Sequence, residues 1–194
     1  MKKSGIIIVL AVLAVLVFWG IGSYNGLVAK QEKLDKSWAD VQSQYKRRAD
    51  LISNLVETVK GYAQHESSTL EAVVNARSKA TQITVDPNNL TPEKLQEFQA
   101  AQSELSNALG RLLLLREAYP DLKANESFLS LQTQLESTEN RIAMAREAFN
   151  LEVQNYNTAV RRFPKNIIAR IFGFERKPTF EIEEKDKNVP EVKF

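Results

Sequence analysis

Residues 4–29 read SGIIIVLAVLAVLVFWGIGSYNGLVA and contain no charged side chain. The centre of this stretch, residues 6–19, holds only apolar side chains. An α-helix rises about 1.5 Å per residue, so about 20 apolar residues cross the hydrocarbon core of a bilayer. The stretch therefore predicts a transmembrane helix, and the remaining sequence is charged and follows a helical pattern.

A cleaved secretory signal is the alternative interpretation, because Lys2 and Lys3 precede the apolar run. The small residues after the run form a poor cleavage site, and the uncharged stretch is longer than the core of a usual signal. Trp19 and Tyr24 also stand where aromatic rings favour the boundary between membrane and water. We therefore expect residues 1–29 to form a short N-terminus and a retained anchor, which makes the chain a single-pass protein of the cell membrane.

Basic residues on the two sides of the predicted span indicate its orientation. Lys2 and Lys3 precede the span, whereas six basic residues follow it within about 20 positions. These six are Lys30, Lys33, Lys36, Lys46, Arg47 and Arg48. Counting them places the bulk of the chain in the cytoplasm. An extracytoplasmic bundle is the alternative, because long translocated domains escape this rule.

Composition argues against most chemical functions. The 194 residues carry a net charge of +2, which gives no reason to expect a nucleic-acid partner, and they include one His and no Cys. Disulfides and thiolate metal sites are thereby excluded. No Gly-rich phosphate loop, nucleophile triad or zinc pattern is present. We predict a protein that is not an enzyme, with no catalytic, cofactor-binding or metal-binding residues and no cofactor.

Apolar residues recur at steps of three and four from residue 27 to residue 84, which predicts a helix with one buried stripe. As one helix this segment would be about 80 Å long, far longer than the helices that must cover it. A break within residues 61–68 removes the mismatch, and Ser68-Thr69-Leu70-Glu71 resembles the capping box of a new helix. The alternative is one continuous helix whose uncovered seam meets another copy of the protein.

Two further helices have clear start signals. Thr91-Pro92-Glu93 predicts an N-terminus with Thr as the cap, after a turn cluster at residues 84–89. That helix should end near Tyr119, because Pro120 disfavours helix in the residue before it. Asn125 is the expected cap of a long helix that ends at Phe163-Pro164, and a short apolar run follows at residues 166–172.

These elements define an all-α fold class. We predict a single N-terminal transmembrane helix, then an up-and-down antiparallel helical bundle of three to four long helices with a short C-terminal helix. The bundle should cover residues 30–174. Residues 175–194 are rich in charge and are expected to form a disordered tail.

Short stretches spread through nearly the whole chain match, in the same order, the sequence pattern of a known family. They are YKRRADLISNLVETVKGY at 45–62, EAV at 71–73, AR at 76–77, YPDLKAN at 119–125, LQ at 131–132, TENRIA at 138–143, AR at 145–146, FN at 149–150, YN at 156–157, FP at 163–164 and GF at 173–174. In these stretches the chain resembles the LemA family. Ile52-Ser53-Asn54 departs from the usual Ile-Pro-Asn of that family.

The resemblance implies a membrane-anchored helical bundle with a short N-terminus outside and the bundle in the cytoplasm. Relatives in the family include a magnetosome membrane protein, which hints at membrane organisation. The family contributes no catalytic residue to this chain.

Two groups of residues are candidate sites. The first is an interaction surface made of Arg47, Arg48, Asn54, Glu57, Lys60, Glu139, Arg141 and Arg146. The alternative for its arginines is a buried or rim ion pair with Glu136 or Glu139, which would fix the register of the helices. His65 has no Glu three residues before it, so we do not expect it to belong to a carboxylate metal site. We expect His65 to be a solvated residue at the helix break.

The second candidate site is a membrane interface formed by Ile167, Ile168, Arg170, Ile171, Phe172 and Phe174. Basic residues flank this apolar segment, so it suits a helix that lies in the bilayer interface. The alternative is a cap that folds over the open end of the bundle.

These observations favour a noncatalytic interaction or scaffold module at the membrane, acting by self-assembly as a coiled-coil-like oligomer. The alternative is an accessory or sensor subunit that regulates a membrane enzyme such as a protease. The expected partners are the lipid bilayer, a second copy of the chain, and an unidentified membrane protein.

Overall fold

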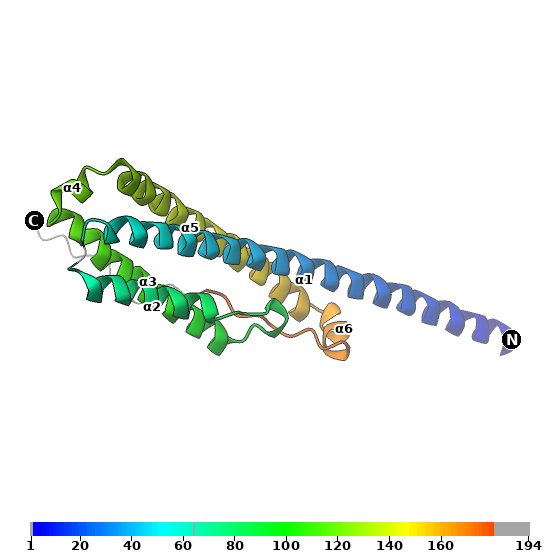
Figure 1. The fold of residues 1–194 in the computed structure, drawn as a ribbon. Helices are drawn as coiled ribbons and strands as arrows, with labels where there is room; N and C mark the ends of the chain where they lie inside the picture. Colours follow the sequence, from blue (N-terminus) through cyan, green and yellow to red (C-terminus); the bar gives the residue numbers. More distant parts are fainter. Residues whose placement is uncertain (1, 64, 181–194) are drawn as a thin grey trace, which may run out of the picture.

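The computed structural model describes residues 2–63 and 65–180 (Figure 1). These residues form α1 (Lys2–Lys60), α2 (Ser67–Gln82), α3 (Pro92–Leu114), α4 (Pro120–Lys123), α5 (Glu126–Arg161) and α6 (Lys165–Ile171). Two short 3-10 helices, η1 (Pro87–Asn89) and η2 (Leu115–Glu117), lie in the connections. The described part of the chain contains no strand, which confirms the predicted all-α class.

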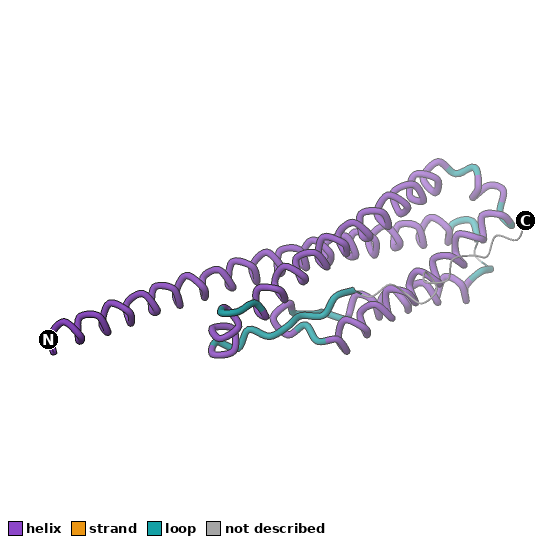
Figure 2. The backbone as a smooth tube through the Cα atoms, turned by 180° about the vertical axis from the view of Figure 1, so that it is seen from behind, coloured by secondary structure: helices purple, strands orange, loops and turns teal. Residues whose placement is uncertain are grey.

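Helix α1 is both the candidate membrane span and the central helix of the bundle. It runs without interruption for 59 residues. Its N-terminal part projects alone from the bundle (Figure 2), and its most apolar window has a mean hydropathy of 2.8 with no residue buried. From Leu27 onward one side of the helix is buried. Among the described residues, one helix is long and apolar enough to cross a membrane, and that helix continues into the core.

The predicted break after the first long helix is confirmed, because α1 ends at Lys60 and α2 begins at Ser67. The alternative of one continuous helix is wrong. The predicted capping box at residues 68–71 is also wrong, since α2 begins earlier and Glu66, at the cap position, makes no side-chain capping bond. Instead Glu66 Oε1 accepts a hydrogen bond from the Tyr119 hydroxyl at 3.1 Å, which ties the turn to the α3–α4 connection.

The four long helices run up, down, up and down, starting from the end of the bundle where α1 projects (Figures 1 and 2). Helices α1 and α5 pack along each other, and α2 and α3 form the second pair. The caps of α3 and α5 are those expected from the sequence. Thr91 accepts from the Lys94 amide at 3.3 Å, and Asn125 accepts from the Phe128 amide at 2.9 Å.

Trp38 is the centre of the half of the core nearer the projecting part of α1. Its ring is fully buried and lies 5.6 Å from that of Phe98, 5.3 Å from that of Phe149 and 5.8 Å from that of Phe180. Its indole N–H donates to the carbonyl of Val85 at 2.9 Å. Residues from α1, α3, α5, the α2–α3 connection and the C-terminal segment thus meet at one side chain.

The prediction of a disordered tail from Glu175 onward is wrong for residues 175–180. After α6 the chain turns at Gly173, which has a φ of 73°, and runs back along the bundle to Phe180, which is buried. We call residues 174–180 the strap. Residues 181–194, the rest of the predicted tail, lie outside the described residues.

Candidate interaction surfaces

Arg48 is a buried link between three helices. It is 2% exposed. Its Nη1 lies 3.0 Å from Glu139 Oε1 on α5 and donates to Ser106 Oγ on α3 at 3.1 Å. Its Nη2 donates to the carbonyl and the side-chain oxygen of Gln102. The structure therefore corrects the expectation that Arg48 presents a contact surface, because the residue forms the ion pair given as the alternative.

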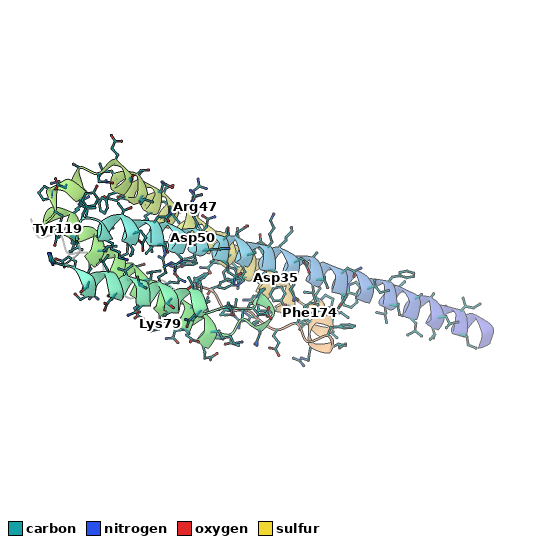
Figure 3. All side chains as sticks on the ribbon, viewed as in Figure 1. Asp35, Arg47, Asp50, Lys79, Tyr119 and Phe174 are labelled. Atoms are coloured by element: carbon teal, nitrogen blue, oxygen red, sulfur yellow. The ribbon has the colours of Figure 1, made fainter. Side chains whose placement is uncertain are left out.

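The other predicted interaction residues divide between exposed and packed positions. Arg47, Asn54, Glu57 and Lys60 are exposed on α1, as are Glu139 and Arg141 on α5. Arg47 and Asp50 both extend from the bundle surface (Figure 3). Arg146 is half-buried, and its guanidinium carbon lies 4.8 Å from the centre of the Phe180 ring. Of the eight residues, Arg48 and Glu139 are brought together, and four form an exposed polar face on α1.

Two asparagines of α5 hold the strap by its backbone. Asn157 donates to the Lys177 carbonyl at 2.8 Å and accepts from the Lys177 amide at 2.9 Å. Asn150 donates to the Phe180 carbonyl at 3.1 Å and accepts from the Phe180 amide at 2.8 Å. The two asparagines are seven residues apart, so they lie on one face of α5. We call this pair the asparagine clamp, and the sequence predicted neither residue as part of a site.

Phe180 is the side chain that anchors the strap. It is 5% exposed and stacks on Trp38 with an angle of 23° between the rings. Phe149 meets it edge-on at 5.4 Å. The clamp and this anchor together explain how a charged segment becomes ordered, since its backbone and one aromatic ring make the contacts while its charged side chains remain near the surface.

A carboxyl group lies under the strap. Burial, and then the charge of Glu32, raises the pKa of Asp35, whereas the Lys177 ammonium lowers it. One oxygen of Asp35 is buried and has no hydrogen-bond partner. Burial likewise raises the pKa of the neighbouring Tyr156 phenol to about 12, with smaller contributions from the charges of Asp35 and Glu175. The position of Asp35 on α1 is shown in Figure 3.

Helix α6 lies against α1 where α1 leaves the bundle (Figure 1). A Cβ on Gly20 would lie 3.9 Å from the Ile168 side chain, so α6 reaches the end of the apolar stretch. Tyr24 contacts Phe172 with ring centres 4.8 Å apart and Phe174 with ring centres 5.7 Å apart. The predicted interface segment thus lies beside residues 20–24 of α1, just after the run of residues 6–19 that holds only apolar side chains.

Helix α6 also has an exposed apolar side. Ile167, Ile171 and Phe172 are exposed, whereas Ile168 and Phe174 are partly buried. Arg170 extends into solvent. The segment therefore packs one side on α1 and leaves three large apolar side chains and one cation uncovered.

Within residues 2–63 and 65–180, no group of three or more His, Cys, Asp or Glu side chains lies close enough to hold a metal ion. His65 is exposed in the α1–α2 turn.

Known proteins resemble most of this chain. The sequence profile of the LemA family matches residues 37–194. The protein LemA of Metamycoplasma hominis is 26% identical over 184 residues, which cover 93% of this chain and 80% of the relative. The magnetosome protein MamQ of Magnetospirillum gryphiswaldense is 27% identical over 79% of this chain and 62% of its own length. The magnetosome protein MamQ 2 of Paramagnetospirillum magneticum is 26% identical over 90% of this chain and 71% of its own length.

Proposed function

The chain belongs to the LemA family, and we propose that it is a noncatalytic, membrane-anchored scaffold that assembles with copies of itself at the bilayer. The observation that carries this proposal is the continuity of α1, which is both the apolar segment and the central helix of the bundle. A rigid helix that enters the core fixes the height and tilt of the bundle relative to the membrane. Any partner bound by the bundle would then be held at a set distance from the lipid.

The surface of the bundle supports an interaction role. The exposed face of α1 carries Arg47, Asn54, Glu57 and Lys60, which mix both charges with a polar amide. Mixed charge suits specific contacts between copies, because like charges facing each other in a wrong register would repel. The names of the relatives, protein LemA and magnetosome protein MamQ, specify no reaction, which supports the noncatalytic part of the proposal.

The second candidate function is an accessory or sensor subunit of a membrane enzyme such as a protease. The same exposed face would then contact one foreign membrane protein at a fixed ratio. For either function we place the bundle in the cytoplasm, because basic residues are more numerous after the span than before it.

Crosslinking in native membranes tests the proposal. The chain has no Cys. A single Cys introduced at an exposed position therefore restricts thiol crosslinking to the surface around that position. Glu57→Cys on α1 should give a covalent dimer at twice the chain mass after treatment with a bifunctional thiol reagent, because each chain then carries one thiol. Lys123→Cys, at the exposed far tip of the bundle, is the matched control and should give little dimer.

The outcomes separate the two functions. A single product containing one foreign membrane protein would replace self-assembly with the accessory role. Equal crosslinking from both positions would indicate random collisions in the membrane, and the scaffold proposal would then fail.

A further inference from the structure

A cleft lined by cationic side chains lies at the base of the bundle. It has a volume of about 570 Å³ and lies between α1, the C-terminal end of α5 and the start of α6. Lys30, Arg162 and Lys165 line it, together with Trp19, Thr158 and Phe163. All the residues that line it belong to the described part of the chain, and they include no carboxylate.

The three cations come from three different elements. Lys30 is on α1, Arg162 follows α5, and Lys165 begins α6. The Lys165 ammonium reaches back to α1, where it would lie 3.7 Å from a Cβ on Gly26. None of the three forms an ion pair among the residues that the structure describes. The lining of the cleft therefore carries positive charge without a carboxylate, and it would attract an anion.

The position of the cleft along α1 identifies the source of that anion. Trp19 lies within the apolar stretch, and Lys30 is the first charged residue after it. The two are about 16 Å apart along the helix axis, which matches the depth of a headgroup and the first part of its acyl chains. The cleft therefore extends from apolar surroundings to the aqueous boundary.

Apolar groups continue this surface. The Phe163 side chain is 76% exposed at the edge of the cleft. Ile167, Ile171 and Phe172 form the uncovered side of the adjoining α6. Exposed apolar side chains at this level favour contact with acyl chains over water. A phosphate with attached acyl chains satisfies both parts of the surface, whereas a soluble phosphate satisfies only the cations.

We propose that the cleft lined by Lys30, Arg162 and Lys165 binds the headgroup phosphate of an anionic phospholipid, with its acyl chains along Trp19 and Phe163. Arg162 and the two lysines supply charge-assisted hydrogen bonds to the phosphate oxygens. The exposed side of α6 rests in the same leaflet. The site fixes the base of the bundle to the bilayer at a second point. This inference rests on the proposed membrane tethering by α1.

Quenching of Trp19 by brominated lipids measures occupancy of the site. The full chain is incorporated in phosphatidylcholine nanodiscs that contain either brominated phosphatidylglycerol or brominated phosphatidylcholine over the same series of mole fractions. Trp38 is fully buried in the bundle and supplies a constant background. The brominated anionic lipid should quench Trp19 at a mole fraction at least about fivefold lower than the zwitterionic lipid does.

Charge-neutral variants separate a defined site from general attraction. Arg162→Gln/Lys165→Gln should abolish the preference for the anionic lipid. Arg47→Gln/Arg141→Gln removes the same charge from exposed positions away from the cleft and should retain it. Arg162→Glu alone, which changes an exposed residue, should also abolish it and provides a second test if the double variant does not fold.

Each other outcome counts against the site. An unchanged preference in Arg162→Gln/Lys165→Gln, or an equal loss in the control, would overturn it. Loss of the preference on adding millimolar glycerol 3-phosphate would assign the cleft to a soluble phosphate instead. Failure of the chain to enter nanodiscs at all would refute the tethering, whereas entry without any lipid preference would refute the headgroup site alone.

Discussion

Arg48 Nη1 lies 3.0 Å from Glu139 Oε1 and joins the central helix α1 to α5. The pair is asymmetric, because the Arg48 side chain is 3% exposed and that of Glu139 is 45% exposed. Water can therefore solvate the Glu139 carboxylate when its partner is removed, whereas water cannot reach the buried Arg48 guanidinium when Glu139 is removed. The buried Nε of Arg48 already lacks a hydrogen-bond partner, so the guanidinium depends on the contacts of its other two nitrogens.

This asymmetry predicts unequal costs for the two single variants. Glu139→Gln leaves a buried guanidinium without its counter-charge and should lower the unfolding free energy by about 1.5–3 kcal/mol. Arg48→Met keeps the apolar stem and should cost less, and the double variant should cost less than the sum of the two. Chemical denaturation in detergent micelles, followed by circular dichroism, measures all three. Arg47→Met on the exposed side is the control and should stay within about 0.5 kcal/mol of the parent. Additive losses would show that the pair is not coupled.

Removal of one half of the asparagine clamp should disorder the strap without unfolding the bundle. Asn157→Ala removes both hydrogen bonds to Lys177, each of which stabilises the strap by about 1 kcal/mol. Hydrogen exchange of the strap amides, measured by mass spectrometry, should therefore accelerate by at least about tenfold while the long helices stay protected. Asn155→Ala, at an exposed position of the same helix, should leave exchange in the strap unchanged. Equal protection in both variants would mean that the strap is held by other contacts.

Removal of the Phe180 ring should change the fluorescence emission of Trp38. Phe180→Ala removes the ring that stacks on the indole and opens the core at its margin. Replacing a buried Phe by Ala typically costs about 3 kcal/mol. Trp38 emission, measured in a Trp19→Phe background, should shift to longer wavelength because water reaches the ring. Phe180→Leu retains apolar volume and should shift it less. A variant Phe180→Ala with unchanged emission would show that the anchor does not shield Trp38.

Local signals in the sequence predicted the features that depend on neighbouring residues. Thr91 before Pro92 and Asn125 before α5 are caps whose partners lie three residues away, so the sequence alone reveals them. The break after Lys60 followed from helix lengths. The pairing of an arginine with Glu139 was one of the alternatives, but choosing between Arg47 and Arg48 required the rotation of α1 about its axis.

The strap could not be predicted because its contacts are remote. Asn157 and Lys177 are 20 residues apart, and Asn150 and Phe180 are 30 residues apart. Their bonds involve the strap backbone, which carries no side-chain pattern for sequence analysis to detect. The charged composition of the segment indicated disorder, and Phe180 is a single apolar residue without periodicity. The cationic cleft was predictable only in part. Arg162 and Lys165 flank the apolar run at residues 166–172, but Lys30 joins them only in the folded chain.

Ionisation of the Asp35 carboxyl should make the stability of the folded chain depend on pH. Its folded-state pKa is raised above 3.8, first by burial and then by Glu32, so the native state binds this proton more tightly than the unfolded chain does. Stability is therefore lost as the pH rises from below 3.8 through the folded-state pKa. Asp35→Asn removes the charge, and its melting temperature should exceed that of the parent at pH 7. The difference should shrink as the pH falls towards the ordinary value for Asp, because the parent then becomes neutral too. Asp40→Asn, on the exposed side of α1, is the matched control for the change in net charge. A lower melting temperature for Asp35→Asn at pH 7 would show that the attraction to Lys177 outweighs burial and the repulsion from Glu32, and the strap would then be held by charge as well as by its backbone.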